Sequence, residues 1–150
     1  MSTLTDIVAA LRQAGLLGVE PVGALPGITG LTADSRRLAS GMLYCAVRGA
    51  VEDGRRYIPA AARAGAAVAL VETPVPVALP QIVVRDGRRA AALAAEIWYG
   101  RPAAKLDLIG VTGTNGKSTT VSLARHVLSA VEPMGSIGTL GAFDPSGAPV

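Results

Sequence analysis

The sequence predicts an α/β fold in which most strands of the sheet run parallel. From about residue 28 onward, apolar stretches of strand length alternate with segments of helical periodicity. This alternation is typical of parallel sheets covered by helices. Half of the 150 residues are hydrophobic and 17% are charged, so the composition favours a buried core over disorder.

The elements of the first part of the chain follow from local patterns. Apolar residues at helical spacing between Leu4 and Leu11, followed by Gly15, predict a short first helix. Asp86 is expected to cap a later helix, because its carboxylate can accept hydrogen bonds from the free N–H groups in the first turn of that helix. The remaining expected elements are a strand over 42–47, a helix over 57–64 closed by Gly65, strands over 67–71 and 81–84 with a proline-rich loop between them, and a helix over about 86–99.

A second α/β unit is predicted to begin near residue 106, after a linker over 101–105. It should contain an apolar strand over 106–111, a glycine-rich turn, a helix over about 117–130 and a strand near 134–139. Two strands and one helix cannot cover both faces of a doubly wound sheet. The predicted domains are therefore 1–100 and 106–150, the latter only the start of a domain.

Composition excludes several classes of function. One cysteine and one histidine rule out a disulfide framework and cysteine-rich or histidine-rich metal sites. The net charge is +3, but the arginines are scattered and only five residues are aromatic, so nucleic-acid binding is not expected. The uncharged run 73–84 is too short and too rich in proline to cross a bilayer. The N-terminal residues 1–6 lack the basic region of a secretory leader. A cytoplasmic protein without membrane insertion is predicted.

The strongest chemical signal is a glycine-rich segment between an apolar stretch and a predicted helix. It reads Gly-Thr-Asn-Gly-Lys-Ser-Thr over 113–119, in the context that a phosphate-binding loop requires. Glycines let backbone N–H groups turn toward phosphate oxygens, and the helix N-terminus adds positive charge. Lys117 is suited to contact the β- and γ-phosphates, and the hydroxyl of Ser118 is suited to ligate Mg²⁺.

The loop departs from the strict phosphate-loop pattern at one position, because Val111 stands where a glycine is expected. A glycine-rich turn without a ligand is therefore the alternative interpretation. Lys117 is the predicted catalytic residue and Ser118 the predicted metal ligand. The predicted nucleotide-binding residues are Gly113, Thr114, Asn115, Gly116, Lys117, Ser118 and Thr119.

This loop, together with Ile-Gly-Val-Thr over 109–112, resembles the ATP loop of the Mur ligase superfamily of ATP-dependent amide-forming ligases. Within that superfamily, several segments resemble the UDP-binding domain of the MurE branch, which adds the third residue of the peptidoglycan stem peptide. These segments are 31–36, 41–49, 53–58 and 66–72. The alternatives are a MurF-type ligase, another ligase of the superfamily, and a stand-alone module that binds a UDP-sugar or ATP without catalysis.

The resemblance implies a Rossmann-like N-terminal domain that binds the UDP-sugar, followed by the start of a P-loop α/β ATP-binding domain. Arg36 is expected to offset the charge of the diphosphate, and an internal ion pair between Asp34 and Arg36 is the alternative interpretation of that turn. The implied contacts to the UDP-sugar come from Ala33, Ser35, Ala50, Val51 and Glu52.

The implied reaction adds a diamino acid, meso-diaminopimelate or L-lysine, to UDP-N-acetylmuramoyl-L-alanyl-D-glutamate. ATP and Mg²⁺ are the implied cofactors, and the UDP-sugar dipeptide and the amino acid are the implied substrates. The carboxylate becomes an acyl phosphate, and the amine then displaces phosphate. Because relatives carry further substrate-binding and metal-binding parts downstream, this chain alone is expected to be inactive.

Overall fold

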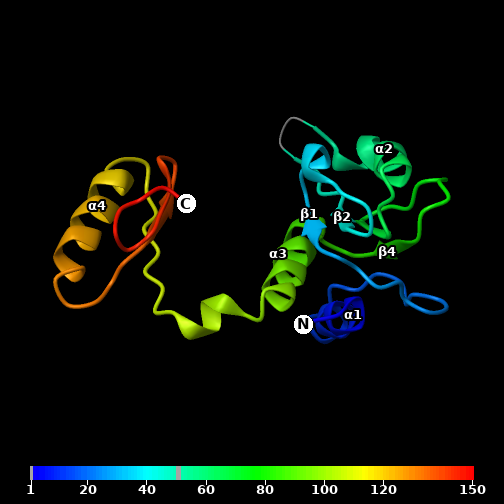
Figure 1. Ribbon diagram of the computed structural model, residues 1–150, viewed down its shortest axis with the longest axis horizontal. Coiled ribbons are helices and arrows are strands. Elements are labelled where there is room, and N and C mark those ends of the chain that lie inside the picture. The colour runs from blue at the N-terminus through cyan, green and yellow to red at the C-terminus, as the bar shows by residue number, and fades with distance from the viewer. Residues whose placement is uncertain (1, 50–51) are drawn as a thin grey trace. The chain divides into compact units, whose positions relative to one another are not determined.

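The computed structural model describes residues 2–49 and 52–150, in two compact units, Met1–Leu106 (unit 1) and Asp107–Val150 (unit 2). Unit 1 contains a four-stranded sheet in the order β1-β2-β3-β4, in which every neighbouring pair is parallel. The prediction of a parallel α/β sheet is confirmed. Its strands are Leu31–Thr32 (β1), Leu43–Cys45 (β2), Val68–Val71 (β3) and Gln81–Val83 (β4) (Figure 1).

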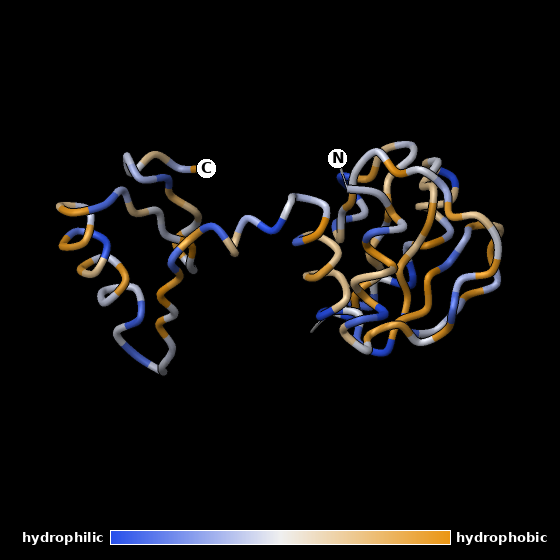
Figure 2. The backbone as a smooth tube through the Cα atoms, turned by 90° about the horizontal axis from the view of Figure 1, so that it is seen from below, coloured by the Kyte–Doolittle hydropathy of each residue, from blue (hydrophilic) through white to orange (hydrophobic). Residues whose placement is uncertain are grey.

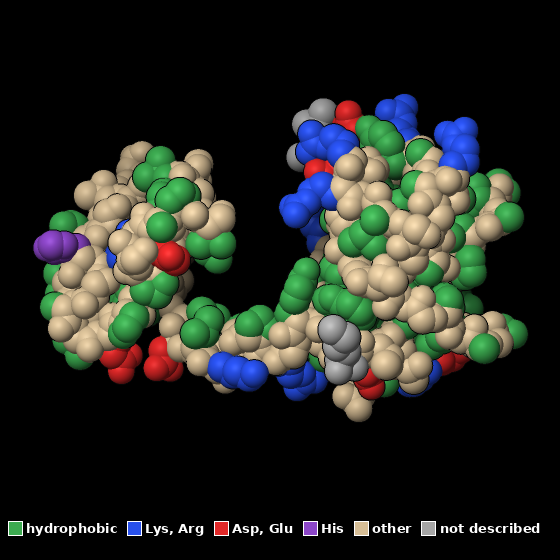
Figure 3. All heavy atoms as spheres, viewed as in Figure 1, with side chains coloured by type: hydrophobic (Ala, Val, Ile, Leu, Met, Phe, Trp, Pro, Cys, Tyr) green, Lys and Arg blue, Asp and Glu red, His purple; other side chains and the backbone are tan. Residues whose placement is uncertain are grey.

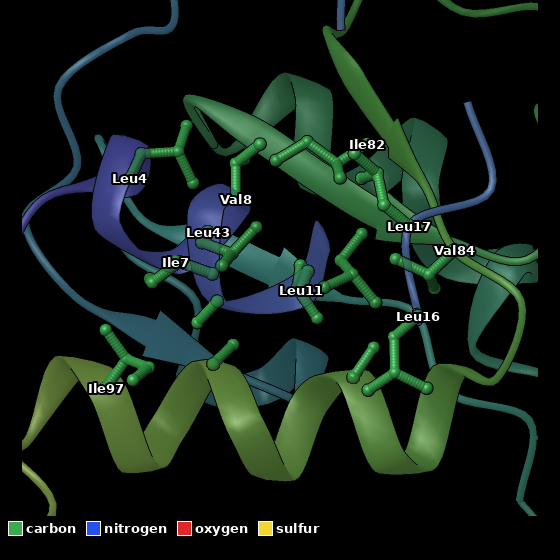
Figure 4. Close-up of a cluster of buried hydrophobic side chains, with 14 of the residues drawn as sticks. Leu4, Ile7, Val8, Leu11, Leu16, Leu17, Leu43, Ile82, Val84 and Ile97 are labelled. Atoms are coloured by element: carbon green, nitrogen blue, oxygen red, sulfur yellow. The ribbon is translucent and has the colours of Figure 1, made fainter. Parts of the chain in front are cut away.

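Helices cover both faces of this sheet, as the alternation of side chains in the strands requires. Leu43 and Cys45 of β2 pack with α1 (Leu4–Gln13) and α3 (Gly87–Trp98) on one face. Tyr44, between them in sequence, packs on the opposite face with α2 (Ile58–Arg63). Figure 4 shows the first of these clusters, in which Leu4, Ile7, Val8 and Leu11 of α1 lie together with side chains of the strands and of α3.

Local capping chemistry sets the helix boundaries. Thr3 and Asp6 form a capping box at the start of α1. The Asp86 carboxylate accepts an N–H group of the first turn of α3 at 3.0 Å, so the predicted cap is confirmed. Gly15 and Gly65 follow α1 and α2 with φ angles of +68° and +81°, a conformation that glycine adopts at little cost.

The carboxyl ends of the parallel strands meet at one edge of the sheet, which we call the carboxyl edge. β1 leads there into a 3-10 helix, η1 (Ser35–Arg37). β2 leads into a narrow hairpin, in which Arg48 and Asp53 form an antiparallel bridge, and then into η2 (Gly54–Tyr57). All residues of β2 and β3 are buried, as expected for a sheet covered on both faces, and Figure 2 shows hydrophobic stretches along the backbone of unit 1.

Unit 2 consists of α4 (Lys117–Leu128) and a two-stranded antiparallel sheet, β5 (Ser136–Gly138) with β6 (Gly141–Phe143). The strand predicted over 106–111 is wrong, since these residues lie outside helices and strands, and Leu108 is 70% exposed. A strand needs a neighbour to pair its N–H and C=O groups, and β5 and β6 pair with each other. The linker predicted over 101–105 is not an irregular connection, because it contains a 3-10 helix, Pro102–Lys105.

Candidate functional site

An open cavity of about 820 Å³ lies in unit 1 beside the ends of β1 and β2. Ala33 and Ser35 reach it from the segment after β1, and Glu52 reaches it from the hairpin after β2. The fold therefore brings three of the five predicted UDP-sugar contacts to one cavity. The other two, Ala50 and Val51, lie outside the described residues. The full lining is Ala33, Asp34, Ser35, Arg36, Tyr44, Val47, Gly49, Glu52, Gly54 and Tyr57.

One wall of the cavity is a capped turn. The Asp34 carboxylate accepts the Arg36 backbone N–H at 3.0 Å and its guanidinium Nη2 at 2.8 Å. These hydrogen bonds lower the pKa of Asp34 to about 2. The internal ion pair is thus present, while the Arg36 side chain stays 87% exposed at the cavity. The hydroxyl of Ser35, in contrast, makes no hydrogen bond within the described part of the chain.

A second turn of the same kind follows β2, and two tyrosines near it line the cavity. Asp53 accepts the backbone N–H of Arg55 at 3.0 Å and its Nη2 at 2.5 Å, and the pKa of Asp53 is lowered to about 2. The Tyr57 hydroxyl donates to the Glu52 carboxylate, which raises the pKa of Tyr57. The Tyr44 hydroxyl donates to the Gly54 carbonyl at 3.0 Å.

Sequence reasoning missed both tyrosines as cavity residues. Tyr44 is 1% exposed, and burial raises its pKa to about 12. One signal was available, because a buried tyrosine needs a partner for its hydroxyl. Its position between Leu43 and Cys45 in an apolar strand places it on the face opposite to theirs. The partner, Gly54, lies ten residues away in the chain, and only the folded structure identifies it.

The predicted phosphate loop precedes α4 in unit 2. Gly113 and Gly116 have φ angles of +148° and +74°, which L-residues with side chains rarely adopt. The first intrahelical bond of α4 runs from the Thr120 N–H to the Gly116 carbonyl, and α4 has no side-chain cap. The N–H groups of the first turn, including that of Ser118, therefore have no acceptor within the helix. The Lys117 ammonium donates to the Gly113 carbonyl at 2.5 Å, so it lies over the loop.

These features fit a polyphosphate. The helix N-terminus has free N–H groups, the two glycines allow the loop to turn tightly, and Lys117 adds a positive charge beside the loop. For Mg²⁺ the loop offers the hydroxyl of Ser118, a hard oxygen that lines an open groove along α4 together with Lys117. Within residues 2–49 and 52–150, no three carboxylate, histidine or cysteine side chains are grouped to hold a metal. No helix in the same residues is long and apolar enough to cross a membrane.

Comparison with known proteins identifies relatives of both units. A family model described as "Mur ligase family, catalytic domain" matches residues 27–109. UDP-N-acetylmuramoyl-L-alanyl-D-glutamate--2,6-diaminopimelate ligases are 44% identical over 79% of the chain in Geobacillus kaustophilus and 46% identical over 85% in Chlorobaculum tepidum. The chain spans 24% and 25% of the length of these two relatives.

Solved structures of related ligases have the same fold. MurF from Acinetobacter baumannii is 26% identical, with a TM-score of 0.66 over 93% of this chain and 30% of that one. MurF ligase from Thermotoga maritima, solved in complex with ADP, is 25% identical, with a TM-score of 0.51 over 67% of this chain and 23% of that one. Because a family model matches more than half of its length and its fold is shared with solved ligases of the family, the chain belongs to the Mur ligase family.

Proposed function

We propose that the chain is the N-terminal portion of an ATP-dependent amide-forming ligase of peptidoglycan synthesis. The activity is that of the MurE type, which adds 2,6-diaminopimelate to UDP-N-acetylmuramoyl-L-alanyl-D-glutamate in the cytoplasm. The observation that carries the proposal is 44–46% identity to ligases of that name over 79–85% of the chain. Since the chain spans about a quarter of those relatives, the amino-acid site and the rest of the active site belong to the remainder of the enzyme.

Residues 1–100 form the UDP-sugar-binding domain in this proposal, with the cavity beside β1 and β2 as the site. Ser35 supports it, because its hydroxyl faces the cavity without an internal partner and can donate to the ligand. The Glu52 carboxylate can accept hydrogen bonds from the nucleoside, and Ala33 contributes apolar contact. The Ala50 and Val51 contacts stay predictions from the family resemblance.

Residues 106–150 form the start of the ATP-binding domain in the same proposal. The segment 113–119 holds the phosphates through its N–H groups, and Lys117 neutralises charge that builds up on the transferred phosphoryl group. Ser118 holds Mg²⁺ through its hydroxyl. When bound, ATP supplies the phosphoryl group that activates the substrate carboxylate as an acyl phosphate. The chain's own residues contribute the orientation of the phosphates and the compensation of their charge.

A MurF-type activity is the second candidate, since solved structures that match the fold include MurF ligases with 25–26% identity. One such structure is named as a ligase that joins D-alanyl-D-alanyl to a UDP-muramoyl chain already carrying diaminopimelate. The full-length enzyme distinguishes the two candidates by its amine substrate. We expect amide formation with 2,6-diaminopimelate and not with D-alanyl-D-alanine, and the opposite result would favour the MurF type.

Calorimetric titration of the chain with UDP-N-acetylmuramoyl-L-alanyl-D-glutamate tests the site in unit 1. We expect a dissociation constant on the order of micromolar to millimolar, because contacts to the peptide end are missing. Ser35→Ala removes one hydrogen bond and should weaken binding about 2- to 10-fold. Ser40→Ala, an exposed serine outside the cavity lining, is the matched control and should bind as the unaltered chain does. Absence of binding by the folded chain would contradict the proposal.

A further inference from the structure

Unit 2 has little hydrophobic core of its own. Residues 107–150 are all at least partly exposed, and both buried hydrophobic clusters of the described residues lie in unit 1. Figure 3 shows hydrophobic side chains on the surface of unit 2. The exposed large ones include Leu123, Val127, Val131, Ile137 and Leu140. Burial of apolar surface therefore contributes less here than in unit 1, and polar contacts matter more for how the elements are held together.

One arginine joins α4 to the chain that follows it. After α4 the chain turns back, and β5 contacts the helix (Figure 1). Arg125, in the last turn of α4, donates from Nε to the Met134 carbonyl and from Nη2 to the Asp144 carbonyl, both at 3.1 Å. Within the described residues, these two are the only hydrogen bonds between α4 and the segment 133–150. Met134 precedes β5 and Asp144 follows β6, so Arg125 holds the β5–β6 hairpin at both of its ends.

The turn after β6 packs directly against this guanidinium. The Asp144 carboxylate accepts the Ser146 hydroxyl at 2.6 Å and the Ala148 N–H at 3.0 Å, which gives the turn a defined shape. A Cβ added at Gly147 would lie 3.0 Å from Arg125 Nη2, so the turn leaves no free space above the guanidinium. Arg125 is partly buried, and its planar fork reaches two carbonyls at once. A lysine ammonium on a flexible stem does not reproduce that geometry.

The hairpin forms one wall of the open groove along α4, which has a volume of about 620 Å³. The lining residues of α4, with Lys117, Val121 and Arg125 among them, recur every four positions and so share one face of the helix. Ile137 of β5 lines the other side. Seven residues, about 10 Å along the helix axis, separate Ser118 from Arg125. Arg125 therefore determines where the hairpin lies along the same face that carries Lys117 and Ser118.

We propose that Arg125 is a positioning residue for the site that begins at the phosphate loop. Its guanidinium anchors the β5–β6 hairpin to α4 and so keeps the second wall of the groove in place before a nucleotide binds. The assignment rests on the proposed function, because that function supplies the nucleotide. A wall that is already in place need not be ordered on binding, which raises the affinity. Arg125 acts through the hairpin, since it lies two helical turns beyond Lys117.

Hydrogen exchange and calorimetric titration with Mg·ADP test this assignment in three variants of the chain. Arg125→Met keeps an unbranched stem and removes both donors, so the hairpin amides should exchange about tenfold faster or more. Mg·ADP should bind this variant about 3- to 10-fold more weakly. Arg125→Lys keeps the charge without the fork, so both effects should be present and smaller. Arg63→Met removes an exposed arginine of α2 and should change neither the exchange of unit 2 nor the binding.

The outcomes separate this assignment from the proposed function. Unchanged exchange of the hairpin in Arg125→Met would overturn the assignment, and so would an equal acceleration over α4, since the arginine would then stabilise unit 2 as a whole. Faster exchange with unaltered Mg·ADP affinity in Arg125→Lys would also overturn it, because charge and not position would then support binding. If the unaltered chain does not bind Mg·ADP, the ATP-binding part of the proposed function fails for this chain. The exchange of Arg125→Met then upholds or overturns the anchoring of the hairpin by itself.

Discussion

Replacing Tyr44 by phenylalanine removes one hydroxyl from beneath the cavity and should destabilise unit 1. The hydroxyl donates to the Gly54 carbonyl at 3.0 Å from a side chain that is 1% exposed. Phenylalanine keeps the packing of the ring, so the change is confined to the hydrogen bond. Its net contribution is about 1 kcal/mol, and the loss rises to about 3 kcal/mol if the Gly54 carbonyl finds no other partner. The same bond joins β2 to η2, so its loss also loosens the wall that carries Tyr57.

Urea unfolding followed by tryptophan fluorescence measures this loss. Trp98 is the only tryptophan in the sequence and packs against the core of unit 1, so its signal reports on that unit. With a slope of about 1–3 kcal/mol per molar urea, a loss of about 1 kcal/mol lowers the midpoint by about 0.3–1 M. Tyr99→Phe is the matched control, because Tyr99 is 67% exposed. An unchanged midpoint for Tyr44→Phe, or the same shift in both variants, would refute the reasoning.

Three further predictions concern unit 1. Burial raises the pKa of Cys45 to about 12, so a thiol reagent at pH 8 should label the chain only after unfolding, and rapid labelling of the folded chain would contradict the burial. The pKa of Asp53 is lowered from 3.8 to about 2 by hydrogen bonds from the Arg55 side chain and backbone; its stabilisation is present above pH 3.8 and is lost as the pH falls toward 2. The urea midpoint of Asp53→Asn should therefore fall less steeply with acid than that of the unaltered chain, and identical acid profiles would count against the pair. Gly65→Ala should cost about 1–2 kcal/mol at φ +81°, whereas Gly27→Ala, whose added Cβ meets nothing within 4 Å, should unfold at nearly the same urea concentration.

Several features of the fold could be predicted from the sequence because their causes are local. Asp86 caps α3 because its carboxylate accepts the backbone N–H of Arg89, three positions later. Gly15 ends α1 because its φ angle of +68° is one that glycine adopts at little cost. The apolar run of β2 predicts a strand buried on both faces, whatever its neighbours are. The family resemblance, which rests on short motifs along the chain, implies contacts from Ala33, Ser35 and Glu52, and the structure brings these three to one cavity. The phosphate loop stays a prediction from its local pattern.

Other features depend on hydrogen-bond or strand partners that are distant in sequence, and local patterns do not identify these partners. The apolar run 106–111 has the composition of a strand, but no strand pairs with it, and its backbone lies outside the sheet. The hydroxyl of Tyr44 needs a partner that its own strand does not supply, and the fold brings it to the carbonyl of Gly54, ten residues away. Hydrogen bonds and ion pairs act over a few ångströms, so the partners of a charge are determined by which elements the fold brings together. The sequence alone thus determined the elements and the motifs, and the tertiary structure decided which side chains are free to meet a ligand.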